Sequence, residues 1–192
     1  MNSDLTRVEE LTVELSTKPY DPVVNFTLGL EYHKYGQLAS ALGCYLRAAE
    51  FGYDTHPDYV YTSLLKIAAC AESQKERTAT VSGALLQAIG YLPARPEAWF
   101  LLARFHERAG NWRECYAFAS AGRSLSRLVN TPLPAWVEYP GEFVFDYEMA
   151  VSGWWIGRRD DSVRIFNDLL THKSMPQEYV NSCINNLRTI GA

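Results

Sequence analysis

Apolar and small residues recur at every third or fourth position along most of the chain, in runs separated by short turns. This period places them on one face of an α-helix. In residues 21–53, Gly29 lies on the apolar face of one predicted helix, and Ala41 and Tyr45 lie on that of the next. Gly36 falls between them, where glycine suits a helix end and a turn. Small residues at these positions allow two helices to pack at about 8–10 Å as an antiparallel hairpin.

The same arrangement returns in residues 57–93, 94–127 and 143–171. Together with 21–53, these units resemble the tetratricopeptide (TPR) repeat, in which a Leu-Gly pair, a tyrosine and a turn glycine precede a second helix of small and aromatic residues. The resemblance implies an all-α fold, a right-handed superhelical solenoid of about four helix pairs.

Two further segments with helical periodicity flank the repeats. Residues 1–18 form a predicted N-terminal helix, and residues 176–191 form a predicted helix that caps the last repeat. Residues 128–142 contain three prolines and Gly141, which predict a long loop that is either ordered or functional. We therefore expect a single TPR-like domain over residues 1–192.

Composition excludes several classes of partner. The chain has 192 residues, is 47% hydrophobic and carries a formal net charge of −4 without a basic cluster, so we expect no nucleic-acid or anionic-membrane binding. The four cysteines are widely spaced and predict free thiols in a reducing compartment. The first ten residues lack the pattern of a secretory signal. We expect a cytoplasmic protein of a bacterium or a phage-infected host, or a virion-associated one.

Motifs for catalysis are missing from the sequence. It contains no glycine-rich phosphate loop, no His-Glu-x-x-His and no Gly-x-Ser-x-Gly. The four histidines, at positions 33, 56, 106 and 172, are spread along the chain rather than paired at metal-ligand spacing. We therefore predict that the chain is not an enzyme and has no cofactor and no metal.

In a TPR stack the first helix of each pair lines the concave surface, so the candidate partner-binding residues lie one step away from the packing positions. These residues are Phe26, Leu30, His33, Leu65, Phe100, Arg104, Tyr147, Val151 and Trp154. Phe26, Leu30 and Leu65 stand where chaperone-binding TPR domains carry the Lys/Asn/Arg carboxylate clamp, which argues against such a clamp here. The groove is expected to hold the N-terminal helix, a twin subunit in a homo-oligomer, or an apolar segment of a protein or peptide partner. The N-terminal helix would otherwise extend the stack at its end.

Two aromatic residues of the loop, Trp136 and Tyr139, have no packing role in the repeat pattern. They either pin the loop onto the helices or form part of a binding surface.

A more specific resemblance covers most of the chain. Residues 95–99 (Arg-Pro-Glu-Ala-Trp) and 150–158 (Ala-Val-Ser-Gly-Trp-Trp-Ile-Gly-Arg) are similar to the TPR-like region that follows the catalytic domain in bacterial and phage family-2 glycosyltransferases. The nucleotide-sugar domain with its Asp-x-Asp motif is not present in this sequence. The resemblance implies a non-catalytic interaction scaffold, such as a phage or bacterial assembly or adaptor protein. The alternative is an accessory subunit that positions the acceptor for a glycosyltransferase encoded elsewhere.

Overall fold

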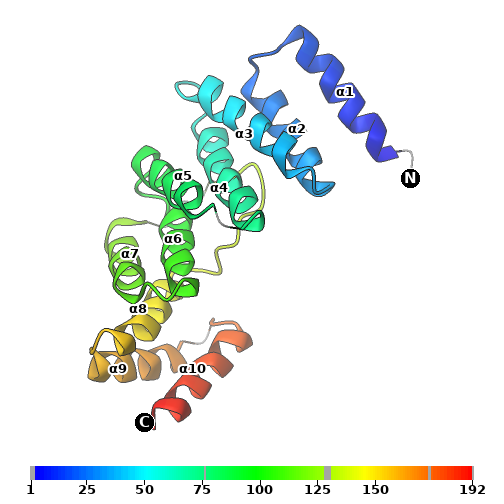
Figure 1. The fold of residues 1–192 in the computed structure, drawn as a ribbon. Helices are drawn as coiled ribbons and strands as arrows, with labels where there is room; N and C mark the ends of the chain where they lie inside the picture. The colour runs from blue at the N-terminus through cyan, green and yellow to red at the C-terminus, as the bar shows by residue number, and fades with distance from the viewer. Residues whose placement is uncertain (1–2, 76, 128–130, 173, 192) are drawn as a thin grey trace. The chain divides into compact units, whose positions relative to one another are not determined.

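The computed structural model describes residues 3–75, 77–127, 131–172 and 174–191. Residues 1–2 of the predicted N-terminal helix and 128–130 of the predicted loop lie outside the described residues. The described residues form helices and connections without strands, as the all-α prediction requires (Figure 1). The helices are α1 (Ser3–Thr17), α2 (Pro22–Lys34), α3 (Leu38–Gly52), α4 (Pro57–Ser73), α5 (Thr78–Tyr91), α6 (Pro96–Arg108), α7 (Trp112–Leu125), α8 (Phe143–Trp155), α9 (Arg159–Leu170) and α10 (Gln177–Ile190).

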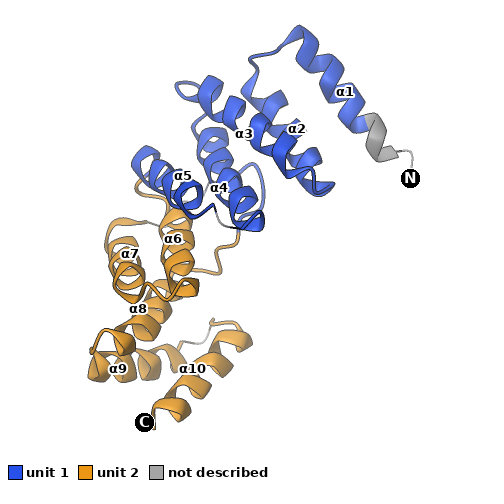
Figure 2. Ribbon diagram, viewed as in Figure 1, with its two compact units in different colours: residues 1–92, 130–137 blue, residues 93–129, 138–192 orange. Residues whose placement is uncertain are grey.

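The chain divides into two compact units (Figure 2). Unit 1 comprises residues 1–92 and 130–137, and unit 2 comprises residues 93–129 and 138–192. Consecutive helices pack as hairpins: α2 with α3 and α4 with α5 in unit 1, and α6 with α7 and α8 with α9 in unit 2. The loop before α8 contributes its first part to unit 1 and its second part to unit 2.

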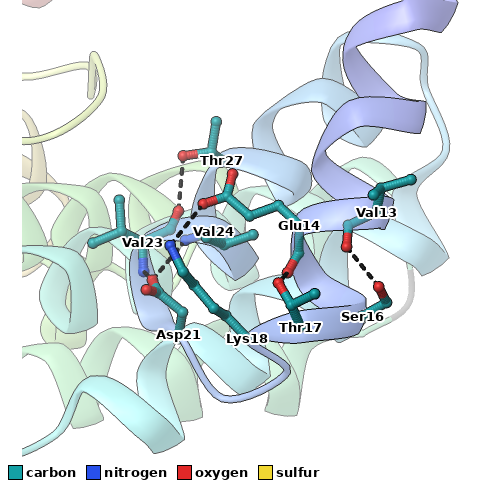
Figure 3. Close-up of polar contacts among 9 residues, drawn as sticks. All are labelled: Val13, Glu14, Ser16, Thr17, Lys18, Asp21, Val23, Val24 and Thr27. Atoms are coloured by element: carbon teal, nitrogen blue, oxygen red, sulfur yellow. Dashed lines mark hydrogen bonds and ion pairs between the residues drawn. The ribbon is translucent and has the colours of Figure 1, made fainter.

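Local sequence explains where the first hairpin begins. The Asp21 carboxylate accepts hydrogen bonds from the backbone N–H groups of Val23 (2.9 Å) and Val24 (3.0 Å), and Pro22 occupies the first turn of α2 (Figure 3). A side-chain acceptor satisfies N–H groups that the helix itself leaves unpaired, and proline has no such group to lose. Directly after α1, the Lys18 ammonium lies 3.2 Å from the carboxylate of Glu14; this ion pair adds little stability because both side chains are exposed.

The turns inside the hairpins depend on left-handed backbone. Gly36, Gly110 and Gly157 follow the first helix of three pairs with φ of 71°, 70° and 88°, which side-chain-bearing residues rarely adopt. The α4–α5 turn has no glycine, and there Lys75 takes the left-handed conformation at φ 57°. The same turn geometry is therefore built with different residues.

Small residues set the distance between paired helices. A Cβ atom built on Gly29 would lie 2.8 Å from Cε1 of the fully buried Tyr45 ring. In unit 2, a Cβ on Gly122 would lie 2.7 Å from the Cβ of Trp99, and Ala103 is completely buried. Close approach of the backbones at these points leaves no room for larger side chains.

The two flanking helices pack onto neighbouring helices. Leu11 of α1 is 2% exposed and forms an apolar cluster with Val24, Leu28 and Cys44 of α2 and α3. This packing makes α1 a further layer on the first hairpin. In unit 2, α10 packs against α9. No helix among the described residues is long and apolar enough to span a membrane.

Candidate functional site

The first helices of successive pairs touch one another within each unit. In unit 1, α2 contacts α4 as well as its own partner α3, and in unit 2, α6 contacts α8 as well as α7. These contacts bring the first helices onto a common side of each unit. We call the surface of α2 and α4 the first-helix face of unit 1, and that of α6 and α8 the first-helix face of unit 2.

Three of the predicted binding residues belong to the core rather than to a surface. Phe26 is 1% exposed, with its ring 5.8 Å from that of Tyr45 and 5.3 Å from that of Tyr59. Leu65 is also buried, and Phe100 is 0% exposed. Phe26 and Leu65 are buried in the core of unit 1, whereas Phe100 is covered in part by the Arg104 guanidinium and by Tyr139 of the loop. None of the three side chains is available to a ligand while the loop is in place. A charged substitution at Phe26 or Phe100 would therefore test folding before it tested binding.

In unit 1, His33 is half-buried beside a hydroxyl and a thiol, and the charge of Lys66 also acts on it. Its Nδ1 atom lies 3.4 Å from the hydroxyl oxygen of Tyr45 and 3.6 Å from the sulfur of Cys70. Burial, followed by the positive charge of Lys66, lowers the pKa of His33, whereas burial raises the pKa of Cys70 to about 11. The thiol is not an activated nucleophile. Leu30, one turn earlier on α2, is half-buried.

Lys66 of α4 holds the first part of the loop. Its ammonium donates a hydrogen bond of 2.8 Å to the backbone carbonyl oxygen of Trp136, and burial lowers the pKa of Lys66. The Trp136 side chain is 79% exposed, so the loop is attached here through its backbone. Sequence reasoning missed Lys66. The available signal was that Lys66 is the one cationic residue of α4 and stands next to the predicted Leu65.

On the first-helix face of unit 2, Arg104 and two aromatic rings receive the second part of the loop. Arg104 forms an ion pair with Glu138, and its guanidinium lies over the Phe100 ring at 5.7 Å from the centroid. The Tyr139 ring lies 6.1 Å from that of Phe100 and 6.2 Å from that of Phe145. The two candidate loop aromatics thus differ: Tyr139 packs onto the helices, whereas Trp136 projects its ring into solvent.

The remaining candidates lie on α8 and are half-buried. The Tyr147 hydroxyl is 2.6 Å from that of Ser182, and its ring meets Tyr179 edge-on at 5.1 Å, so α10 partly covers it. Trp154 has the guanidinium of Arg159 over its ring at 4.9 Å. Val151 lies between these two positions on the helix.

A buried carboxyl on α8 was not recognised from the sequence. Glu148 is 4% exposed, and its Oε2 atom lies 3.6 Å from the sulfur of Cys115 on α7. Burial, followed by the negative charge of Glu107, raises the pKa of Glu148 to about 7. A glutamate among the apolar residues of α8 was a weak signal, because the pattern alone does not say which face is enclosed.

Within the part of the chain that the structure describes, no group of three or more His, Cys, Asp or Glu side chains is arranged to hold a metal ion.

The fold can be compared with known proteins. No protein-family model matches the sequence, and no curated protein matches it. Solved structures do match: MamA is 15% identical, with 85% of each chain covered and a TM-score of 0.66. A Podosopora anserina putative kinesin light chain with nearly identical TPR-like repeats is 14% identical, with 88% of this chain and 86% of that chain covered and a TM-score of 0.60.

A third match is YrrB, described as a TPR protein with an unusual peptide-binding site. It is 14% identical, with 94% of this chain and 85% of that chain covered and a TM-score of 0.59. The fold is TPR-like. The predicted all-α TPR-like class is thereby confirmed.

Proposed function

We propose that this TPR-like chain is a non-catalytic interaction module that binds a protein or peptide partner on its first-helix faces. One observation carries the proposal: side chains of the first helices already hold a non-helical chain segment in this structure. In unit 1 the Lys66 ammonium donates a hydrogen bond to the carbonyl oxygen of Trp136, and in unit 2 Arg104 pairs with Glu138. A surface that accepts one such segment has the chemistry to accept another.

The composition of the unit 2 face supports peptide binding. Arg104 and Tyr147 are half-buried, and Val151 and Trp154 add half-buried apolar surface on α8. Aromatic residues and arginine contribute strongly to binding energy because they combine large contact areas with directed polar groups. The likeness to YrrB, described as having a peptide-binding site, agrees with this assignment.

The titratable groups support a non-catalytic role. Burial raises the pKa values of Cys70 and Cys183 to about 11, so both thiols stay protonated near neutral pH. The buried Glu148 is enclosed between α7 and α8, where a substrate does not reach it. A catalytic group needs access to the reacting atoms as well as a suitable pKa.

The narrower role is that of an assembly or adaptor protein in a bacterium or phage, and it rests on the sequence resemblance alone. The same is true of the alternative, an accessory subunit that positions the acceptor for a glycosyltransferase. Genes for virion structure beside this one would favour the first role, and a glycosyltransferase gene without a TPR-like region would favour the second.

A matched pair of valines tests the proposed binding face. Peptides that bind the full chain are first selected from a display library. Their affinities are then measured for Val151→Asp, on the first helix α8, and for Val163→Asp, on the second helix α9; both valines are half-buried. We expect Val151→Asp to weaken binding at least tenfold and Val163→Asp to leave it unchanged, with circular dichroism confirming that both variants fold. Equal affinities, or a loss confined to Val163→Asp, would contradict the proposal.

A further inference from the structure

The segment 138–142 of the loop lies on the surface that the proposed function assigns to a partner. We propose that this segment is a built-in stand-in for the partner, and that the partner is a peptide presenting a carboxylate followed directly by an aromatic ring. The inference rests on the proposed function, because it names the ligand and the regulation of the same face of unit 2.

The carboxylate half of the stand-in is Glu138. Its ion pair with Arg104 joins a residue of α6 whose side chain is 23% exposed to a loop residue whose side chain is 46% exposed. The Arg104 guanidinium lies over the Phe100 ring, which restricts its position before any ligand arrives. A planar cation held in this way matches a carboxylate in charge and in hydrogen-bonding geometry.

The aromatic half is Tyr139, whose ring contacts one ring from each first helix, Phe100 of α6 and Phe145 of α8. Its hydroxyl is buried, and none of the described residues hydrogen-bonds it. Burial, followed by the negative charges of Glu142 and Glu97, raises the pKa of Tyr139, so the hydroxyl stays protonated. A buried hydroxyl without a hydrogen-bond partner destabilises the packing of the loop on α6 and α8. A phenylalanine ring would fill the same place without this energetic cost.

The loop that contains residues 138–142 can detach from α6 and α8 without breaking a helix. It spans residues 126–142, well beyond the roughly 2–8 residues usual between packed helices, and its described residues form no helix. Gly141, the last residue but one of the segment, has φ 135°, a conformation that favours glycine, and α8 begins two residues later. A loop of this kind costs little to displace because its backbone is not part of a helical hydrogen-bond ladder.

Competition between the loop and a free peptide gives a measurable effect. A tethered segment acts at an effective concentration on the order of millimolar. If the loop occupies the face in about nine molecules of ten, the apparent affinity for a free peptide is about tenfold lower than that of the vacant face. Loosening the loop should therefore strengthen peptide binding, and tightening it should weaken binding.

The test uses the full chain and a fluorescent peptide, Ala-Trp-Val-Glu-Phe-Pro-Gly-Glu, which copies residues 135–142 with phenylalanine in place of tyrosine. We expect the variant Glu138→Ala/Tyr139→Ala to bind it about tenfold more tightly than the natural chain. We expect Tyr139→Phe, which removes the unpartnered hydroxyl, to bind it several-fold more weakly. A control peptide with Gln for the first Glu should lose most of its affinity, and adding Arg104→Gln to the double variant should remove the difference between the two peptides.

Each other result contradicts the inference. Equal affinity of the natural chain and the double variant would show that the loop does not compete, and lack of binding to either would show that the stand-in does not represent a ligand. Dimers of the natural chain that the double variant abolishes would identify the occupant as the loop of a second copy. Selected peptides that depend on Val151 but ignore the loop variants would overturn this inference while supporting the proposed function.

Discussion

Replacing Gly29 by alanine tests the close packing inside the first hairpin. The added Cβ would lie 2.8 Å and 2.9 Å from two carbons of the Tyr45 ring and 3.2 Å from the Cβ of Cys44. Tyr45 is fully buried and its ring is packed against Phe26, so it has little room to move. Overpacking of this kind costs about 1–3 kcal/mol.

Gly83 in the middle of α5 provides the matched control, because nothing lies within 4 Å of a Cβ built there. Glycine to alanine in a helix interior gains about 0.5–1 kcal/mol at either site, so this gain cancels in the comparison. We therefore expect Gly29→Ala to be less stable than Gly83→Ala by about 1–3 kcal/mol. Denaturant unfolding followed by circular dichroism measures both. Equal gains in stability would refute the packing argument.

Two further changes test other parts of the structure. Burial raises the pKa of Glu148 to about 7 from an ordinary value of 4.5, so the natural chain should lose stability as the pH rises from about 5 to 8. Relative to Glu148→Gln, this loss should approach about 3 kcal/mol. Parallel pH profiles of the two proteins in thermal unfolding would contradict this. Leu11→Ala should lower the free energy of unfolding by about 2–3 kcal/mol, because Leu11 is buried against α2. Val13→Ala, at a site 68% exposed, should change the unfolding midpoint little. Equal effects would mean that α1 is not a packed layer.

Much of the fold could be predicted because it depends on local patterns. Gly36, Gly110 and Gly157 each follow the end of a helix, where the turn needs a left-handed residue. Gly29 indicated a close approach of two helices from the sequence, and the structure shows that Tyr45 lies at this point. These features need only neighbouring residues along the sequence.

The candidate site was harder to predict because it depends on contacts between distant segments. Periodicity placed Phe100 and Arg104 on one side of the same helix, but it could not show that Phe100 is enclosed while Arg104 meets Glu138. The prolines of residues 128–142 predicted a loop, but they could not show that Tyr139 packs onto α6 and α8. Burial of Glu148 likewise depends on how α7 meets α8.

Photo-cross-linking tests most directly whether the first-helix face of unit 2 binds peptides. The peptide is Ala-Trp-Val-Glu-Phe-Pro-Gly-Glu with a benzophenone ring in place of the phenylalanine ring, bound to the full chain carrying Glu138→Ala/Tyr139→Ala. Mass spectrometry then locates the attachment sites. The account predicts attachment within α6 (Pro96–Arg108) and α8 (Phe143–Trp155). Attachment confined to α7 (Trp112–Leu125) or α9 (Arg159–Leu170) would contradict it.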